Sequence, residues 1–373
     1  DSPPDIVGLL PGDKIIAIDD YDAYKITKNE VFEKLRGRKG TEVKITISRL
    51  GAAKPFDVTI VRDNIPIYSI GAATMLDNKT GYIFLRRFSA TTEKEFVSAV
   101  NTLLEKGMER LLFDLRGNSG GFLEQAAAIS DQFITTVDTL VYTKGKIKES
   151  NQVFKSTPSK GNNTLSLIIL INRGSASASE IVSGAVQDLD RGLIVGETSF
   201  GKGLVQRQLP LDTGSAIRVT IARYYTPSGR LIQRPFEDGS DLAYYQELYS
   251  VDREEKIDSL KELRPKYNTR SGRVVYGGGG ITPDIYIPYE NKINGETMKV
   301  LRNAKRPFFN FASKKTGAIG SKYSSFIDFK NNWEPNDNMI DDFFNFLDAD
   351  TITVSRDSLM LDIDYIKNQI KSE

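Results

Sequence analysis

The sequence has 373 residues, of which 39% are hydrophobic and 27% are charged, a composition typical of a globular protein rather than a disordered one. The formal net charge of +1 gives no electrostatic reason to expect nucleic acid or an anionic membrane as a partner. The absence of histidine and cysteine excludes Ser-His-Asp triads, cysteine nucleophiles, disulfides and metal sites built on these residues. A hydrolase of this sequence therefore needs Lys, Asp, Glu or Tyr as its base, or a metal site built on carboxylates alone.

Residues 1–64 are predicted to form a small β-rich domain. A turn at residues 8–13 leads into an apolar strand at 15–18, and a short helix at 28–35 ends before Gly37. Two further strands are marked by alternating apolar residues, namely Val43, Ile45, Ile47, Val58 and Ile60. These elements fit a small sheet domain that binds no ligand as well as a domain that binds one.

Residues 65–290 alternate predicted strands and helices, which is typical of an α/β domain. Thr92-x-x-Glu95 predicts a capping box at the start of an amphipathic helix that ends at Gly107. The continuous apolar run at 165–171 predicts a strand buried on both faces. The other predicted elements are strands at 111–113 and 193–195, a helix around 126–128 and a helix at 176–190.

Residues 291–373 predict a mostly helical extension in which we find no residues of evident chemistry and no internal repeat. No apolar run in the sequence approaches the roughly 18 residues that a transmembrane helix requires.

Three serines, Ser175, Ser177 and Ser179, alternate with alanines between a predicted buried strand and a helix. A hydroxyl at a helix N-terminus lies where free amides and the helix dipole favour developing negative charge, as acyl transfer requires. Ordinary helix capping explains the same residues, because serine is a preferred N-cap. The segment alone leaves both interpretations open.

Lys202 lies between Gly201 and Gly203 after a predicted strand, with Phe200 and Leu204 close by. A lysine ordinarily titrates near about 10.4 and must lose about 3 pH units to act as a base near neutrality, which burial among apolar neighbours can supply. A solvated surface lysine is one alternative. A phosphate-binding loop is another, but Gly203 replaces the required Ser or Thr, and residues 204–210 predict a strand instead of a helix.

Two segments, RGSASASEI and GETSFGKGLVQ, resemble the signature of the C-terminal processing peptidases, also called tail-specific proteases. In that family the nucleophilic serine lies 25 residues before the lysine base, which implies Ser177 and Lys202 here. The family orients its lysine with a glutamine four residues later, which is Gln206. Four residues of extended strand span about 13 Å, so a contact between Lys202 and Gln206 requires the chain to bend near Gly203.

The segment at 114–121 is similar to the family's DLR-x-N-x-GG loop. The resemblance implies an oxyanion hole made by the backbone amides of Gly121 and Ala178, with Gly120 as the adjacent competitor. A glycine-rich turn that needs positive φ angles is the alternative reading of this loop. Further similarity to the family occurs in ARYYTPSG at 222–229 and GGITPD at 279–284.

The resemblance implies an α/β fold with a crotonase/Clp-like peptidase core at 65–290. The LLPGDKIIAID stretch resembles a PDZ domain at 1–64, whose front we expect to be missing from this chain. PDZ domains bind free peptide C-termini as an added edge strand. The extension at 291–373 looks most like that of the longer members from Bacteroidetes-type bacteria.

The resemblance further implies protein substrates with free C-terminal tails, cleavage in the cell envelope, and no metal or cofactor. We expect a periplasmic or membrane-associated protein whose N-terminal signal is absent from this chain, without nucleic acid partners and compatible with a homo-oligomer.

Two hypotheses follow from the sequence. The first is a serine endopeptidase in which Ser177 attacks and Lys202 is the general base. The second is a PDZ-type peptide-binding scaffold in which the catalytic site is present but not assembled.

Overall fold

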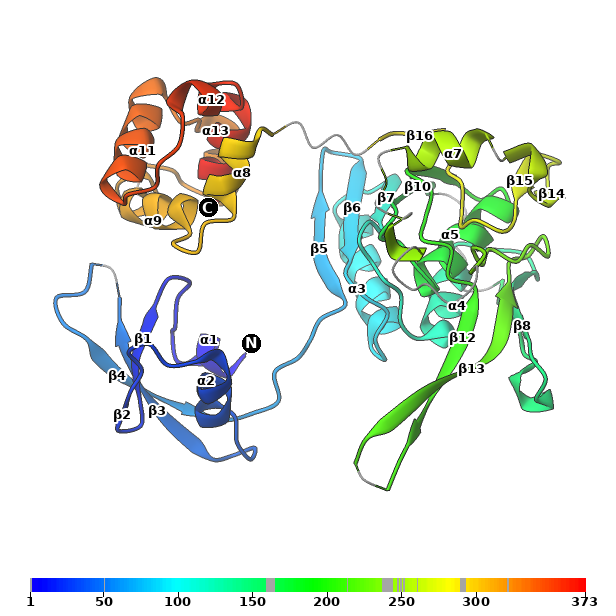
Figure 1. The fold of residues 1–373 in the computed structure, drawn as a ribbon, viewed down its shortest axis with the longest axis horizontal. Coiled ribbons are helices and arrows are strands. Elements are labelled where there is room, and N and C mark those ends of the chain that lie inside the picture. Colours follow the sequence, from blue (N-terminus) through cyan, green and yellow to red (C-terminus); the bar gives the residue numbers. More distant parts are fainter. Residues whose placement is uncertain are drawn as a thin grey trace. The chain divides into compact units, whose positions relative to one another are not determined.

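A computed structural model gives the fold of the chain (Figure 1). It describes residues 2–373 except 50, 159–164, 213, 237–243, 247, 249, 251, 260, 289–292 and 321. The chain divides into two compact units. The terminal unit comprises residues 1–66 and 290–373, and the central unit comprises residues 67–289.

The first part of the terminal unit is an antiparallel sheet of order β2-β1-β3-β4 with helix α2 (Lys28–Leu35). Its strands are β1 (Lys14–Ile18), β2 (Tyr21–Asp22), β3 (Glu42–Ser48) and β4 (Phe56–Val61). Alternation in β3 buries Val43, Ile45 and Ile47, so the predicted strands and the helix are confirmed. The short helix α1 (Pro3–Ile6) was not predicted.

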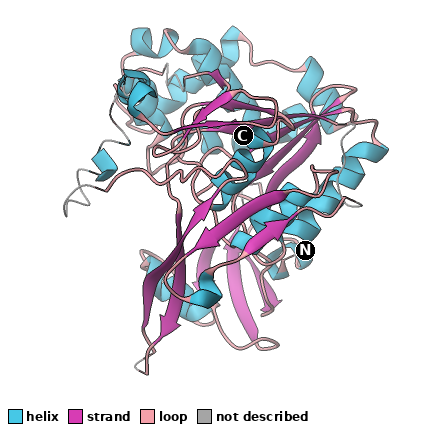
Figure 2. Ribbon diagram, turned by 90° about the vertical axis from the view of Figure 1, so that its right-hand side faces the viewer, coloured by secondary structure: helices cyan, strands magenta, loops and turns pink. Residues whose placement is uncertain are grey.

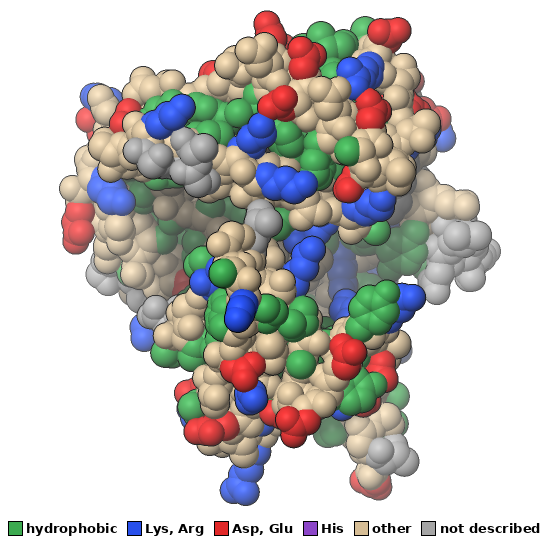
Figure 3. Space-filling model, turned by 90° about the vertical axis from the view of Figure 1, so that its left-hand side faces the viewer, with side chains coloured by type: hydrophobic (Ala, Val, Ile, Leu, Met, Phe, Trp, Pro, Cys, Tyr) green, Lys and Arg blue, Asp and Glu red, His purple; other side chains and the backbone are tan. Residues whose placement is uncertain are grey.

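The second part of the terminal unit is helical. Its helices are α8 (Gly295–Leu301), α9 (Pro307–Gly320), α10 (Phe326–Asn332), α11 (Asp337–Ala349), α12 (Arg356–Met360) and α13 (Ile363–Ser372). They enclose their own apolar core, in which the Phe308 and Phe343 rings stack with centroids 4.9 Å apart. Figure 3 shows one face of the molecule, on which Lys and Arg side chains are interspersed with Asp and Glu, as the near-zero net charge leads one to expect.

The central unit is built on a six-stranded sheet of order β16-β11-β10-β7-β6-β5 (Figure 1). All neighbours are parallel except β5 and β6. The strands are β5 (Ile70–Met75), β6 (Thr80–Leu85), β7 (Arg110–Asp114), β10 (Ser166–Ile171), β11 (Leu193–Gly196) and β16 (Ile285–Tyr286). Helices α3 (Thr92–Glu105), α4 (Leu123–Asp131) and α5 (Ala178–Asp188) connect them in the predicted α/β alternation.

One face of this sheet packs against helices α3, α4 and α5 to form the main apolar core. Full burial of each large aliphatic side chain there stabilises the fold by roughly 1.5–3 kcal/mol. The prediction that strand β10 is buried on both faces is wrong. Leu167, Ile169 and Ile171 are buried, but Ile168 on the opposite face is 37% exposed. The helices cover only the face of the strand that carries Leu167, Ile169 and Ile171.

The predicted capping box at Thr92 is also wrong. Thr91 is the N-cap of α3 and Thr92 lies inside the helix, where its buried hydroxyl bonds Ser69 Oγ and accepts from the Ser89 amide. Glu95 accepts a bond from the Ser69 amide instead of the expected N-cap amide. Hydrogen bonds to Ser69 therefore take the place of those expected in the capping box.

A second sheet of the central unit has the antiparallel order β12-β13-β8-β9. Its strands are β8 (Thr139–Lys144), β9 (Val153–Lys155), β12 (Leu204–Pro210) and β13 (Ala216–Tyr225), and β14 (Lys266–Asn268) pairs with β15 (Val274–Tyr276) in a separate ribbon. The β12–β13 hairpin projects from the unit in both ribbon views (Figures 1 and 2). Further helical segments of the unit include α7 (Arg253–Ser259) and two 3-10 turns, Lys148–Ser150 and Lys261–Leu263.

Residues 204–210 form a strand, as predicted, so the Lys202 segment lacks the helix that a phosphate-binding loop requires. Among the described residues, no helix is long and apolar enough to cross a membrane.

Candidate active site

Three loops of the central unit follow the adjacent parallel strands β7, β10 and β11. The carboxyl ends of parallel strands meet at one edge of a sheet, which is where open α/β sheets bind their ligands. The loop after β7 carries the glycines at 117–121, the loop after β10 carries Ser177, and the loop after β11 carries Lys202. The sheet topology therefore gathers the three motifs that are widely separated in the sequence.

Ser177 is the N-cap of helix α5 and has φ 56° and ψ −111°, an unusual conformation for a residue with a side chain. Such a conformation costs about 1–3 kcal/mol and persists only where the surrounding structure holds it. The neighbouring serines have structural roles, because buried Ser175 Oγ donates to Leu115 O and buried Ser179 Oγ donates to Asn118 O, both at 2.8 Å. Of the three serines, Ser177 is the one that lines the cavity described below.

Glu180 connects the serine loop to the lysine loop. Its fully buried carboxylate accepts bonds from the backbone amides of Ser177 at 2.8 Å and Lys202 at 2.9 Å. The Gly201 amide and the Ser199 hydroxyl donate to its other oxygen. Burial raises the pKa of Glu180, and these four donated bonds act in the opposite direction by stabilising the ionised form. One carboxylate thus fixes the backbone at both predicted catalytic positions.

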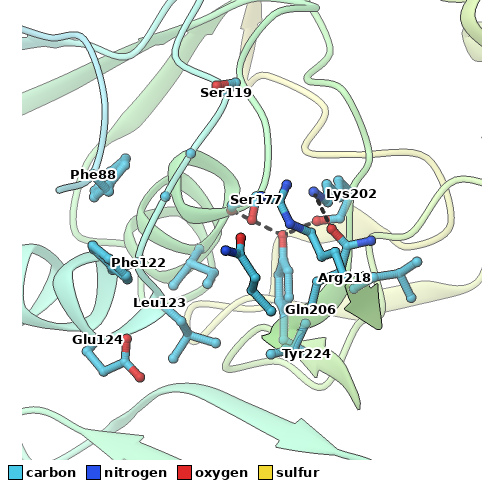
Figure 4. A pocket seen from close by; sticks show the side chains of 16 residues that line it. Phe88, Ser119, Phe122, Leu123, Glu124, Ser177, Lys202, Gln206, Arg218 and Tyr224 are labelled. Carbon is cyan, nitrogen blue, oxygen red and sulfur yellow. Dashed lines mark hydrogen bonds between the residues drawn. The ribbon is translucent and has the colours of Figure 1, made fainter. Parts of the chain in front are cut away.

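Tyr224 on strand β13 makes a second connection between the same two loops. Its buried hydroxyl lies 3.1 Å from the Ser177 carbonyl and 2.6 Å from the Lys202 carbonyl, and donates toward both (Figure 4). Burial raises the pKa of this phenol well above its usual range, so it remains a donor at all ordinary pH values.

The Lys202 amine donates to Gln206 Oε1 at 3.3 Å, the contact expected from the sequence (Figure 4). Lys202 precedes strand β12, and the register of β12 with β13 shifts between Val205 and Gln206, so the two residues do not share one regular extended strand. Burial lowers the pKa of Lys202, the Arg218 guanidinium lowers it further, and the Glu180 carboxylate opposes both effects. No hydrogen bond joins Ser177 Oγ to Lys202 Nζ, although both residues are described.

The glycine loop lies directly against the serine loop. A Cβ atom on Gly120 would come within 2.8 Å of Ser177 Cβ and 2.9 Å of Ala178 N. The Gly120 amide already donates to Asn118 Oδ1 at 2.9 Å, whereas no bond from the Gly121 amide occurs among the described residues. The φ angles of 97° at Gly120 and 152° at Gly121 show that the loop also needs glycine for conformation.

A cavity of about 640 Å³ opens beside Ser177 and Lys202 (Figure 4). Its wall combines apolar side chains with a polar strip from the β12–β13 hairpin. The lining includes Phe88, Gly121, Phe122, Leu123, Ile181, Gln206, Gln208, Arg218 and Tyr224. The cavity therefore offers both apolar surface and hydrogen-bonding groups beside Ser177.

The structure brings Ser177, Lys202, Gln206 and Gly121 to this one cavity, with Ala178 buried as the first residue of α5. The sequence analysis missed Glu180, Tyr224 and Arg218. Glu180 had a detectable signal, because Ser177-x-x-Glu180 matches the capping-box pattern in which an acidic side chain reaches back to the N-cap amide. Tyr224 lies in the ARYYTPSG segment that resembles the family, but nothing in that segment indicates which groups its hydroxyl bonds, and Arg218 had no comparable local signal.

Comparison with known proteins gives two family matches. Residues 79–238 match the model of peptidase family S41, and residues 304–373 match a family of unknown function (DUF8443). The chain is 39% identical over 239 residues to a carboxy-terminal-processing protease of Bartonella bacilliformis, covering 62% of this chain and 54% of that protein. It is 36% identical over 233 residues to the carboxy-terminal processing protease CtpA of Bacillus subtilis, covering 62% of this chain and 49% of that protein.

The chain thus spans about half the length of these curated relatives. A solved structure of a photosystem II D1 C-terminal processing protease is 24% identical, with a TM-score of 0.43, and the match covers 77% of this chain and 66% of that one.

Proposed function

Since the chain belongs to peptidase family S41 and is related to carboxy-terminal processing proteases, we propose that it is a serine endopeptidase that cleaves proteins near their C-terminal tails. Ser177 Oγ attacks the scissile carbonyl, and neutral Lys202 accepts the hydroxyl proton and later returns it to the leaving amine. Gln206 orients the lysine. The amides of Gly121 and Ala178 stabilise the oxyanion of the tetrahedral intermediate.

The observation that carries the proposal is the convergence of both predicted residues on one cavity, with their backbones fixed by the same buried carboxylate. The Gly121 amide, which donates no bond to any of the described residues, is a better candidate for the oxyanion hole than the Gly120 amide, which bonds Asn118. The absence of a bond between Ser177 and Lys202 does not oppose the proposal, since hydrogen bonds at catalytic sites often tighten only in the complex with substrate.

We assign the role of tail recognition to the sheet and helix at residues 1–64, as a PDZ domain that adds the substrate tail as an edge strand. The names of the relatives support tail processing for this chain. We also propose that the protein acts in the cell envelope, the location that the resemblance of its sequence to the tail-specific proteases implies.

The second candidate, a peptide-binding scaffold with an unassembled site, is favoured by one observation. Lys202 bonds Gln206 and not Ser177. This candidate predicts that the protein binds a tail but leaves it uncut.

Cleavage of a protein with an unstructured C-terminal tail, followed by mass spectrometry, separates the two candidates. We expect the wild type to shorten the tail and Ser177→Ala to be inactive. Ser183→Ala is the matched control, because its hydroxyl lies on the same helix but bonds only Ser179 O. Binding of the tail without cleavage by the wild type would refute the peptidase, as would cleavage that survives Ser177→Ala.

A further inference from the structure

Arg218 places a positive charge in the candidate active-site cavity. It lies on strand β13 opposite Gln208, and both residues line the cavity that contains Ser177 and Lys202 (Figure 4). Arg218 and Lys202 also share the wall of an adjoining cavity of about 760 Å³. The two cations therefore lie together where the two cavities meet.

Arg218 has no partner that neutralises its charge: among the described residues it makes no hydrogen bond and no ion pair. Other arginines near the site are paired, since Arg116 bonds Asp114 at 2.6 Å and Arg173 bonds Glu197 at 2.8 Å. Arg218 is exposed, so water solvates its guanidinium and no carboxylate of the described residues neutralises its charge. What distinguishes Arg218 is its place in the same cavity walls as Lys202.

The charged groups around Lys202 come from three elements. Glu180 on α5 is buried and accepts bonds from backbone amides, and Glu124 on α4 is an exposed residue of the cavity rim. Tyr224 on β13 is neutral because burial raises its pKa. Arg218 is thus the positively charged side chain that these elements place near Lys202. The Glu180 carboxylate favours a protonated lysine, and the charge of Arg218 opposes this effect.

We propose that Arg218 serves catalysis by holding a second positive charge beside the Lys202 amine, so that the amine stays neutral and can accept the Ser177 proton. This inference rests on the proposed role of Lys202 as general base. Two like charges repel each other, and the partial burial of Lys202 reduces the screening by water at the lysine end, which disfavours protonation of the lysine. The direction in which Arg218 moves the pKa of Lys202 agrees with this role.

In this proposal Arg218 does not contact the reacting atoms. It influences the reaction only through the positive charge that it holds beside Lys202. Direct contact of Arg218 with a substrate carboxylate is the competing explanation. The two differ in pH dependence, because a substrate contact changes the rate at every pH, whereas a charge beside the base changes the rate only where the base is partly protonated.

The test compares kcat/KM against pH for the wild type and three variants. We expect Arg218→Gln to lose about 3- to 10-fold at pH 7, since a difference of about 1.4 kcal/mol in charge interaction is tenfold, and to approach the wild type at high pH. Arg218→Lys keeps the charge and is expected to stay within about 2-fold of the wild type. Arg207→Gln is the matched control, because Arg207 lies between Gln206 and Gln208 and its side chain points to the opposite face of β12.

A second readout does not require cleavage. Competitive acetylation of Ser177→Ala, with and without Arg218→Gln, followed by peptide mass spectrometry, measures at which pH Lys202 becomes reactive. We expect Arg218→Gln to move this pH upward and Arg207→Gln to leave it unchanged. An unchanged labelling curve, or a loss of kcat/KM that is uniform across pH, overturns the proposal. Absence of cleavage by the wild type together with a shifted labelling curve would instead refute the peptidase function alone.

Discussion

Glu180→Gln is the substitution that most directly tests how the structure holds the two loops together. The glutamate accepts four hydrogen bonds through two oxygens, and every partner is a donor. Glutamine keeps one oxygen and replaces the other with an NH2 group, which is itself a donor. Turned one way, the NH2 group faces the amides of Ser177 and Lys202; turned the other way, it faces the Gly201 amide, while the Ser199 hydroxyl can rotate to accept from it. One or two donors therefore lose their acceptor in a fully buried position.

The cost follows from these one or two donors. Each buried polar group left without a partner costs about 1–3 kcal/mol, so the free energy of unfolding should fall by about 1–6 kcal/mol. That is a large part of the about 5–15 kcal/mol that stabilises an ordinary domain. The amides of Ser177 and Lys202 would also separate, and misplacement of catalytic groups by about 1 Å can lower the rate about 100-fold.

Urea unfolding followed by circular dichroism measures the first effect, and cleavage of an unstructured tail measures the second. Glu105→Gln is the control, because Glu105 is an exposed carboxylate at the end of α3 and should change neither quantity. A Glu180→Gln variant with the stability and activity of the wild type would refute the reasoning, since it would mean that the carboxylate does not hold the two loops.

Three further predictions follow from the site. Tyr224→Phe removes the hydroxyl shared by the two loops and should lower kcat about 10-fold, at a cost of about 1 kcal/mol of stability in urea unfolding; kcat equal to that of the wild type would contradict the bridging role. Gly121→Ala should abolish cleavage, because the added Cβ would lie 2.0 Å from Phe88 O, and an active variant would show that this loop does not form the oxyanion hole. Lys202→Met should stabilise the protein near pH 6 while abolishing cleavage. Because burial lowers the pKa of the folded lysine, its protonation opposes folding at low pH, and urea unfolding should show the gain from Met shrinking as pH rises toward the ordinary value of 10.5; a gain that is independent of pH would contradict the lowered pKa.

Regular alternation made the strands and the α2 helix of residues 1–64 predictable, because local patterns decide which side chains can share a core. Tertiary contacts explain the failures. Thr92 has a capping sequence, but its hydroxyl bonds Ser69, which is 23 residues away in the sequence, and the Ser89 amide in the turn before the helix. Ile168 lies in a continuous apolar run, yet only one face of its strand is covered by helices.

The residues of the candidate site likewise include some that the sequence predicts and some that it does not. Ser177, Lys202 and Gln206 came from a family resemblance in the sequence, and the structure brings them to one cavity. The roles of Tyr224 and Arg218 could not be predicted, because they depend on strand β13 folding back over both loops. The choice between Gly120 and Gly121 needed the position of the Asn118 side chain, which no local pattern provides.

The central claim is that Ser177 is the nucleophile and that Lys202 activates it. The most direct measurement is to react the protein with a fluorophosphonate and identify the modified residue by peptide mass spectrometry, for the wild type and for Lys202→Met. We predict modification at Ser177 in the wild type, with a rate that rises with pH as Lys202 loses its proton, and almost no modification in Lys202→Met. Modification at another serine, or an undiminished rate in Lys202→Met, would contradict the account.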